Sequence, residues 1–339
     1  MPTKPINLGV IGAGRIGKIH AENIATRIRG ARLAGVADVN LAAAQDLAGQ
    51  FHVPLATAEY RQLLDAPDIE AVAICSATDT HAQIICKAAA RGKHIFCEKP
   101  IDYDLTHITQ ALEAVKKTGV KFQVGFNRRF DPSFARAREL VAAGKIGTPH
   151  IVRVTSRDPA PPPLDYVKVS GGIFLDMTIH DFDMVRFLSG SEAVEIFAVG
   201  DALVDPEIGR AGDVDTCIVT MRLANGSLAT IDNSRKAVYG YDQRVEVFGS
   251  AGMVSVSNRT PDHLVLSNAD GVHSAKPQHF FLERYEEAYV RELQAFIDCI
   301  EQDSAPAVTG VDGLRPVIMG LAAKKSLAEN RPVNLNEIV

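Results

Sequence analysis

The segment 171–188 combines an apolar helical pattern with side chains that can transfer protons. At about 100° per residue, Asp176, His180 and Asp183 fall on one narrow side of a predicted helix, and apolar residues cover most of the rest. Asp176 and His180 are four residues apart, so their side chains are predicted to be neighbours. A buried carboxylate beside an imidazole can hold the ring in one tautomer and tune it as a base. The pattern therefore fits either a general-base pair or a polar pair that is only structural.

A glycine-rich turn near the start of the chain has the form of a dinucleotide site. It follows a predicted strand and precedes a predicted helix, as the Gly-x-Gly-x-x-Gly motif requires. Gly12 permits the tight turn, Gly14 lets the backbone approach a pyrophosphate, and Gly17 lets the helix pack on the strand. The helix N-terminus then offers free N–H groups and a partial positive charge to the phosphates. We expect cofactor contacts from the whole motif, which is Gly12, Ala13, Gly14, Arg15, Ile16 and Gly17.

Asp38 ends the second predicted strand, 21 residues after Gly17. A carboxylate at this point accepts hydrogen bonds from both ribose hydroxyls and repels a 2′-phosphate. Val39 and Asn40 follow it, so no arginine is supplied there. The sequence therefore predicts NAD as the cofactor rather than NADP.

Two further strand ends are predicted at the same edge of the sheet. The third strand ends near Ser76, Thr78 and His81, which are candidates for contacting the cofactor. The alternative for Thr78 and His81 is a structural role at the start of the next helix, with Thr80 as its N-cap. The fourth strand ends in Glu98-Lys99-Pro100, which places a lysine cation at the crevice.

The elements that must position these residues follow from the periodicity of the chain. Five strands alternate with four helices up to residue 127, which predicts a parallel sheet covered on both faces. Beyond it we expect helices at 131–147, 171–188, 285–302 and 313–330, and period-two strands at 150–158, 193–203, 215–226, 227–235, 242–252 and 253–259. The fold class is therefore α/β, with a dinucleotide-binding domain at 1–125 and an α+β domain at 126–339 that has a largely antiparallel sheet.

Composition excludes several classes of partner. The 339 residues are enough for two cores, and 36 Lys and Arg against 41 Asp and Glu give a net charge of −5. With no basic tract, we expect neither nucleic acid nor an anionic membrane as a partner. No run of about 18 apolar residues is present, and the N-terminus lacks a signal-peptide pattern. The five cysteines are widely spaced, which favours free thiols and a cytoplasmic location.

The chain resembles the Gfo/Idh/MocA family of NAD(P)-dependent sugar and polyol oxidoreductases at residues 12–17, Asp38, 98–100 and 171–187. The resemblance covers essentially the whole chain. Within the family, the blocks 124–134, 155–162, 171–187 and 239–250 look most like the inositol 2-dehydrogenases. The resemblance to this family implies a Rossmann domain, an open-faced sheet in the second domain, and assembly as a homodimer or homotetramer through that sheet.

The resemblance also implies a mechanism. Lys99, Asp176 and His180 match the family's catalytic lysine and its Asp–His pair, and Glu98 and Lys99 lie where cofactor contacts are expected. In NAD-dependent oxidation of myo-inositol to 2-keto-myo-inositol, His180 would be the general base, with Asp176 orienting the ring and Lys99 donating to the reacting oxygen. These three would also bind substrate. Further substrate contacts are expected from Asn127, Arg128, Asp158, Tyr239 and Tyr241, each of which could equally be structural.

Several alternatives stay open from the sequence. The substrate could be scyllo-inositol, another inositol isomer or an aldose such as glucose. Asp176, His180 and Asp183 could instead bind a divalent metal, although the lysine-assisted reaction needs none. A non-catalytic regulator that senses a dinucleotide could share the fold. The sequence does not decide the oligomer size, the physiological direction, or whether the proline-rich loop 158–166 is a lid or a subunit contact.

Overall fold

The computed structural model describes residues 4–339 and divides them into two compact units. The first contains residues up to 130 together with 287–315, and the second contains 131–286 and 316–339. The predicted division at residue 125 did not include the return of 287–315 to the first unit. The reason is apolar packing, since Leu293, Phe296 and Ile297 are buried in the first unit's core.

The first unit is built on a parallel sheet, as predicted, although the sheet has six strands where five were expected. The strands run in the order β3-β2-β1-β4-β5-β6, and every pair is parallel. Their bounds are β1 (Ile6–Ile11), β2 (Ala31–Ala37), β3 (Leu55–Thr57), β4 (Ala71–Ile74), β5 (His94–Glu98) and β6 (Phe122–Gly125). β1, β4 and β6 are buried at every residue, because helices cover both faces of the sheet.

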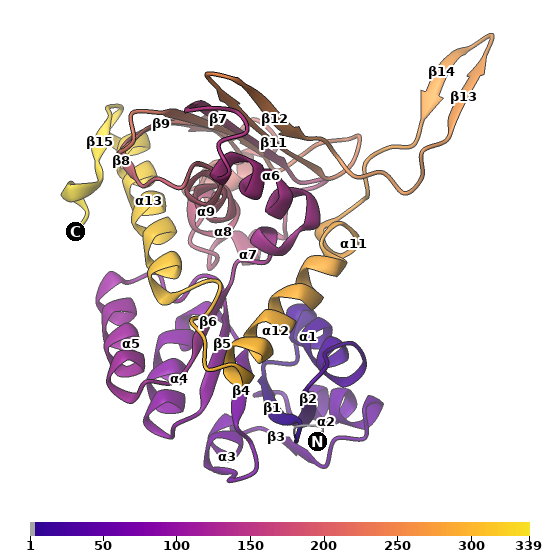
Figure 1. Cartoon of the computed structure of the whole chain (residues 1–339), viewed down its shortest axis with the longest axis vertical. Coiled ribbons are helices and arrows are strands. Elements are labelled where there is room, and N and C mark those ends of the chain that lie inside the picture. Colours follow the sequence, from indigo (N-terminus) through magenta and orange to yellow (C-terminus); the bar gives the residue numbers. More distant parts are fainter. Residues whose placement is uncertain (1–3) are drawn as a thin grey trace. The chain divides into compact units, whose positions relative to one another are not determined.

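Helices of the first unit pack on the two faces of this sheet (Figure 1). They are α1 (Arg15–Thr26), α2 (Leu41–Gln50), α3 (Tyr60–Asp65), α4 (Thr78–Ala90), α5 (Leu105–Thr118), the 3₁₀ turn η1 (Asn127–Phe130) and α12 (Glu286–Glu301). α1, α2 and α12 share one apolar core with β1, β2, β4 and β5. Local chemistry sets the bounds of α5, where Asp104 accepts hydrogen bonds from the N–H groups of Thr106 and His107 and Gly119 ends the helix with φ +72°. The short β3 and α3 had no counterpart in the predicted elements.

The second unit is built on a seven-stranded mixed sheet in the order β12-β11-β7-β10-β9-β8-β15. Only the β7–β10 pair is parallel in the described sheet, so the prediction of a largely antiparallel sheet is confirmed. The strands are β7 (Pro149–Arg157), β8 (Ala193–Asp201), β9 (Thr216–Leu223), β10 (Leu228–Ser234), β11 (Asp242–Gly249), β12 (Gly252–Val256) and β15 (Val333–Asn334). An additional hairpin of β13 (Val265–Asn268) and β14 (Gly271–Ser274) projects from this unit and was not predicted (Figure 1).

Helices of the second unit begin with α6 (Pro132–Ala142), whose first turn is capped by Asp131. The others are α7 (Leu164–Val167), α8 (Ile173–Asp176), α9 (Thr178–Ser189), α10 (Pro206–Arg210), α11 (Phe281–Arg284) and the 3₁₀ turn η2 (Leu335–Glu337). α13 (Gly310–Glu329) has its first turns in the first unit and the remainder in the second. No helix within residues 4–339 is both long and apolar enough to span a membrane.

The segment 171–188 is not the single helix that its periodicity predicts. α8 ends at Asp176, and α9 starts at Thr178 after Met177, whose φ and ψ are −97° and −60°. The His180 N–H lies 3.3 Å from the Met177 carbonyl oxygen, a tight three-residue spacing that starts a new helix. Asp176 and His180 therefore belong to different helices, and the prediction of one continuous helix over 171–188 is wrong.

Candidate active site

The glycine turn between β1 and α1 is closed by contacts that only glycine allows. Gly12 has φ +104°, and a Cβ there would lie 2.5 Å from the carbonyl oxygen of Cys75. A Cβ at Gly17 would lie 1.8 Å from the carbonyl oxygen of Gly12. The two glycines are thus required for α1 to approach β1 and β4 so closely.

Gly14 has a different status, because the protein itself does not need a glycine there. Its φ is −71°, and among the described residues no atom outside its immediate chain neighbours would lie within 4 Å of an added Cβ. No side-chain hydrogen bond caps the start of α1 in the described chain. An exposed glycine before an uncapped helix N-terminus fits a pyrophosphate that approaches the backbone. Ala13 is buried, whereas Arg15 is exposed and Ile16 is half-buried.

Asp38 is tied to this turn by its side chain. Its Oδ2 accepts a hydrogen bond from the Ala13 N–H at 2.6 Å, and its Oδ1 accepts one from the Asn40 N–H at 2.8 Å. The carboxylate is therefore held beside the glycine loop, where a ribose joined to the pyrophosphate would lie. The residues present fit an NAD molecule with a free ribose 2′-hydroxyl.

The end of β4 is held by His81. Its Nδ1 lies 2.8 Å from the Pro100 carbonyl oxygen and its Nε2 lies 3.0 Å from that of Ser76. The ring is 1% exposed, and burial lowers the pKa of His81. Both nitrogens face protein carbonyls, so the ring links the residues after β4 to the turn after β5.

The neighbours of His81 also have protein partners. The Ser76 hydroxyl lies 2.7 Å from that of Thr80, and α4 starts at Thr78 after Ala77. Thr80 is therefore not the N-cap, although its hydroxyl donates to the Ala77 carbonyl. Thr78 is half-buried in the first turn of α4.

The turn after β5 carries Glu98, Lys99 and Pro100. Glu98 accepts a hydrogen bond from His20 Nε2 at 2.6 Å, so α1 and β5 are joined at their side chains. Lys99 is half-buried, and Pro100 is buried with its carbonyl oxygen on His81. The structure thus places the predicted cofactor residues Glu98 and Lys99 in the same unit as the glycine loop and Asp38.

In the second unit, Asp176 is held by two side chains that the sequence analysis did not single out. Tyr166 donates its hydroxyl to Asp176 Oδ1 at 2.8 Å, and Arg235 Nη2 forms an ion pair with Oδ2 at 3.0 Å. Tyr166 comes from α7, at the end of the proline-rich loop. This loop therefore delivers a hydrogen-bond donor to the predicted catalytic carboxylate.

Arg235 joins Asp176 to another predicted residue. Its guanidinium is 2% exposed, and Nη1 lies 3.8 Å from Asp158 Oδ2. Burial alone would lower the pKa of Arg235, but the charges of Asp176 and Asp158 raise it above its usual value. The structure thus brings Asp158 and Asp176 together around one buried cation.

His180 lies in the first turn of α9, which a polar contact anchors to β10. The Thr178 hydroxyl donates to Asn233 Oδ1 at 2.6 Å, and Asn233 Nδ2 donates to Asp181 Oδ2 at 2.8 Å. Asp181 is fully buried against the sheet, so it serves this anchor. Asp183 is 1% exposed and lies 3.6 Å from Arg186 Nη1. Asp181 and Asp183 therefore both contact side chains of the second unit.

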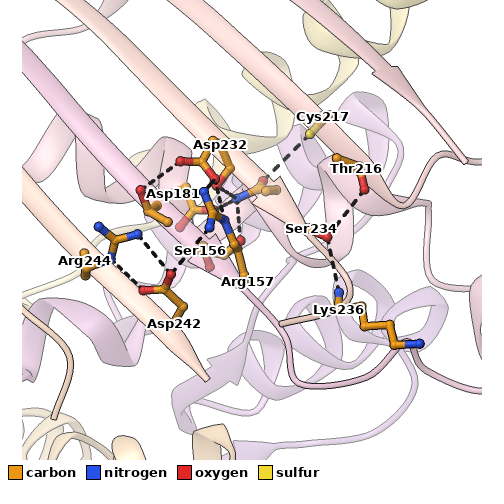
Figure 2. Close-up of polar contacts among 12 residues, drawn as sticks. Ser156, Arg157, Asp181, Thr216, Cys217, Asp232, Ser234, Lys236, Asp242 and Arg244 are labelled. Atoms are coloured by element: carbon orange, nitrogen blue, oxygen red, sulfur yellow. Dashed lines mark hydrogen bonds and ion pairs between the residues drawn. The ribbon is translucent and has the colours of Figure 1, made fainter. Parts of the chain in front are cut away.

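The two candidate tyrosines lie in different surroundings. Tyr239 donates to Asp242 at 2.6 Å and accepts from Arg157 at 3.1 Å. Arg157 and Asp242 belong to a polar cluster that also contains Asp232 and Arg244 (Figure 2). Burial and the hydrogen bond to Asp242 raise the pKa of Tyr239. Tyr241 is 6% exposed and packs edge-on against Phe280 and Tyr285.

The remaining predicted substrate residues, Asn127 and Arg128, lie in the 3₁₀ turn after β6 and are 3% and 4% exposed. The adjacent Arg129 forms an ion pair with Asp312 at 2.9 Å. The two arginines are therefore not an exposed surface pair.

Tyr166, Asn233 and Arg235 are the positioning residues that sequence reasoning missed. Tyr166 and Arg235 contact Asp176, and Asn233 fixes the start of α9. Arg235 is the last residue of the strand predicted at 227–235 and directly follows β10, and its position in the sequence did not indicate that it is buried.

Comparisons with known proteins agree with this organisation. Residues 6–126 match the model of an oxidoreductase family with an NAD-binding Rossmann fold, and residues 134–255 match the GFO/IDH/MocA C-terminal domain. An uncharacterized oxidoreductase of Bacillus subtilis is 49% identical over 98% of this chain and 97% of its own. A myo-inositol 2-dehydrogenase of Thermotoga maritima is 48% identical over 98% of this chain and its full length.

A solved structure extends the similarity to three dimensions. Scyllo-inositol dehydrogenase of Lactobacillus casei, with bound NAD(H) and scyllo-inositol, is 34% identical. It superposes with a TM-score of 0.93 and covers 98% of this chain and 100% of that one. With both domains matched and relatives aligned from end to end, the chain belongs to the Gfo/Idh/MocA family of oxidoreductases and has its NAD-binding Rossmann fold.

Proposed function

We propose that this NAD-dependent oxidoreductase oxidises myo-inositol at one secondary alcohol, giving 2-keto-myo-inositol. The observation that carries the proposal is the end-to-end match, at 48% identity, to a relative named myo-inositol 2-dehydrogenase. The choice of NAD is supported by Asp38, whose carboxylate is bonded to the glycine loop.

The chemistry divides between the cofactor and the protein's side chains. NAD, when bound, accepts the hydride from the alcohol carbon. His180 takes the hydroxyl proton as the general base, since imidazole titrates near neutral pH. Lys99 donates a hydrogen bond to the reacting oxygen and stabilises the negative charge that develops on it.

Asp176 orients His180 and accepts from a neighbouring substrate hydroxyl in this proposal. Its support is the pair of contacts from Tyr166 and Arg235, which restrict the carboxylate to one position. Arg235 is nearly excluded from water, so its charge acts strongly on the carboxylate.

A polyol with many hydroxyls requires several fixed donors and acceptors, because a buried group left without its partner rejects the wrong isomer. Asn127, Arg128 and Asp158 are proposed substrate contacts. Tyr239 and Tyr241 are weaker candidates, since one bridges Arg157 and Asp242 and the other packs among aromatic rings.

Scyllo-inositol is the second candidate substrate. It is supported by the similarity to the Lactobacillus casei enzyme, whose structure contains that ligand with NAD(H). The two inositols differ at a single carbon centre, so the same family of contacts could accept either.

The test is a panel of myo-inositol, scyllo-inositol and D-glucose with NAD and with NADP, repeated for His180→Ala and Lys99→Ala. We expect NADH formation from an inositol and a loss of kcat of roughly 10²- to 10⁴-fold in each variant. Circular dichroism checks that the variants fold. Wild-type rates in either variant would remove that residue from the mechanism. If a chelator abolished the activity and a metal ion restored it, a metal-dependent reaction would be favoured instead.

We also propose that the protein is a cytoplasmic homodimer or homotetramer assembled through the open face of the second unit's sheet. Strand register puts exposed apolar side chains in two rows across neighbouring strands. One row contains Val199 and Ile218, and the other contains Leu228, Phe248 and Met253. Apolar patches of this kind are typical of interfaces. Light scattering on wild type and on Ile218→Asp with Phe248→Asp tests this, and a wild-type monomer would reject it.

A further inference from the structure

A buried cluster of three titratable side chains lies in the first unit, next to the turn that carries Lys99. His20 from α1, Glu98 from β5 and Glu292 from α12 each contribute an atom, and these atoms lie within 4.8 Å of one another. His20 and Glu292 are 0% exposed, whereas the Glu98 side chain is 13% exposed. Two carboxyl groups and one imidazole therefore share a site that only Glu98 connects to solvent.

The two carboxyl groups of the cluster differ in their hydrogen bonds. His20 Nε2 is 2.6 Å from Glu98 Oε1, so the ring is a donor to this carboxylate. Neither carboxylate oxygen of Glu292 has a hydrogen-bond partner among the described residues. Its backbone is fixed, because Gln123 donates to the Glu292 carbonyl at 2.7 Å. The carboxyl group is thus aimed into the cluster without a donor for either oxygen.

Aromatic rings, thiols and the charge of Glu98 surround Glu292 in the described chain. Aromatic rings of Phe96 and Tyr289 pack edge-on against His20 at centroid distances of 5.0 and 5.8 Å. The described titratable groups that face the cluster are His20 on α1, Cys75 after β4, Cys97 and Glu98 on β5, and Tyr289 on α12. Burial first, and the charge of Glu98 second, raise the pKa of Glu292 well above its usual value.

Two carboxylates this close and this deeply buried resist simultaneous ionisation, and no donor in the described chain contacts either oxygen of Glu292. One proton removes the repulsion and also provides the missing donor. Glu98 is the group that keeps the negative charge, because it reaches solvent and already accepts from His20. Glu292 is the group that keeps the proton, because it has no access to water.

We propose that Glu292 is a protonated carboxylic acid that donates to Glu98 and acts as a positioning residue for the turn containing Lys99. Contacts with both His20 and Glu292 restrict the Glu98 carboxylate to one orientation. This holds the end of β5 against α1 and α12, and Lys99 follows directly in the chain. The positioning role rests on the proposed function of Lys99, whereas the shared proton does not.

The first experiment measures the thermal midpoint Tm of wild type and Glu292→Gln from pH 5 to pH 8, without substrate. Glutamine keeps the shape and donates to Glu98 but cannot ionise. An unfolded chain releases the Glu292 proton near pH 4.3, whereas the folded protein keeps it, so wild type loses stability relative to the variant as pH rises. We expect the difference in Tm to change by roughly 5 °C over this range. Comparing the two proteins cancels the titration of groups outside the cluster of His20, Glu98 and Glu292.

Glu301→Gln, an exposed glutamate on the same helix, is the matched control and should give a difference in Tm that does not vary with pH. A pH-independent difference for Glu292→Gln would overturn the shared proton. One equivalent of metal that stays bound to wild type through dialysis and is missing from Glu292→Gln would also overturn it, since the cluster would then be a cation site.

The second experiment separates positioning from packing. Glu292→Met fills a similar volume but cannot donate to Glu98, whereas Glu292→Gln can. On whichever polyol wild type oxidises, we expect Glu292→Gln to keep kcat within about threefold and Glu292→Met to lose at least about tenfold, which corresponds to one lost hydrogen bond to a charged group. Equal kcat values in the two variants would overturn the positioning role. If Glu292→Met does not fold, the pH dependence of Tm still decides the shared proton. Glu292→Leu, which is smaller and also lacks a donor, then replaces it in the kcat comparison that decides the positioning role.

Discussion

The cofactor turn of the first unit and the acid–imidazole segment of the second hold their functional groups in different ways. In the first unit, backbone geometry does the positioning, through two glycines that no side chain could replace and an aspartate bonded to a main-chain N–H. In the second unit, side chains from distant strands and loops do it, with Arg235 and Tyr166 on Asp176 and Asn233 beside α9.

This difference explains why the cofactor turn is easier to predict from the sequence than the side-chain network around Asp176. A turn such as the glycine loop needs its residues at fixed short spacings, because adjacent peptide units form it. A side-chain network can draw its members from anywhere in the chain. Substitutions at either site should therefore have different consequences for stability and for activity.

The largest effect is expected within the glycine turn, where two glycines should behave oppositely. Gly17→Ala places a Cβ against the Gly12 carbonyl and should lower the free energy of unfolding by about 3 kcal/mol or more. Gly14→Ala meets no such obstacle among the described residues and should leave stability within about 0.5 kcal/mol of wild type. Its effect should be a raised Kd for NADH. Urea unfolding and NADH fluorescence titration measure the two, and equal destabilisation would contradict the assignment of Gly14 to the cofactor.

The second prediction concerns the network around Asp176. Arg235→Met removes a buried cation from two carboxylates and should cost about 2 kcal/mol of stability, with a fall in kcat larger than any rise in KM for the polyol. Arg186→Met is a suitable control, since that arginine pairs with Asp183 and Glu192 instead. An Arg235→Met enzyme with wild-type kcat would show that Asp176 needs no such support.

The third prediction tests Asp38 in the first unit. Asp38→Asn keeps an acceptor for the Ala13 N–H but removes the charge that would repel a 2′-phosphate. The ratio of kcat/KM for NAD to that for NADP should fall about tenfold, which corresponds to about 1.4 kcal/mol. Steady-state rates with both cofactors measure it. An unchanged ratio would mean that Asp38 has only a structural role in the loop.

The smallest effect is expected from His81. Burial lowers its pKa in the folded protein, so the unfolded chain binds the proton more readily. The stability that this residue contributes is therefore present above about pH 6.5 and is lost as pH falls through the folded-state pKa. Relative to His81→Asn, wild type should lose less than about 1 kcal/mol between pH 8 and pH 5.5. A difference in stability that grows as pH falls would contradict the direction of the pKa shift.

The α/β alternation, the glycine turn, Asp38 and the mixed second sheet could all be predicted, because each depends on local periodicity or on residues close in the chain. The prediction of one continuous helix over 171–188 failed, since hydrophobic periodicity does not report the interruption at Met177. The domain division missed 287–315 for a related reason. An amphipathic helix shows which face is buried but not which core receives it.

The sequence by itself determined the family, the cofactor-binding motif and the residue types available for proton transfer. Only the tertiary structure decided that Arg235 and Tyr166 hold Asp176, that Asp181 anchors α9, and that Glu292 lies against Glu98 nearly 200 positions away in the chain. The physical reason is the difference in sequence distance over which the two kinds of interaction act. Backbone preferences act over a few residues, whereas buried charges find their partners wherever packing brings two segments together.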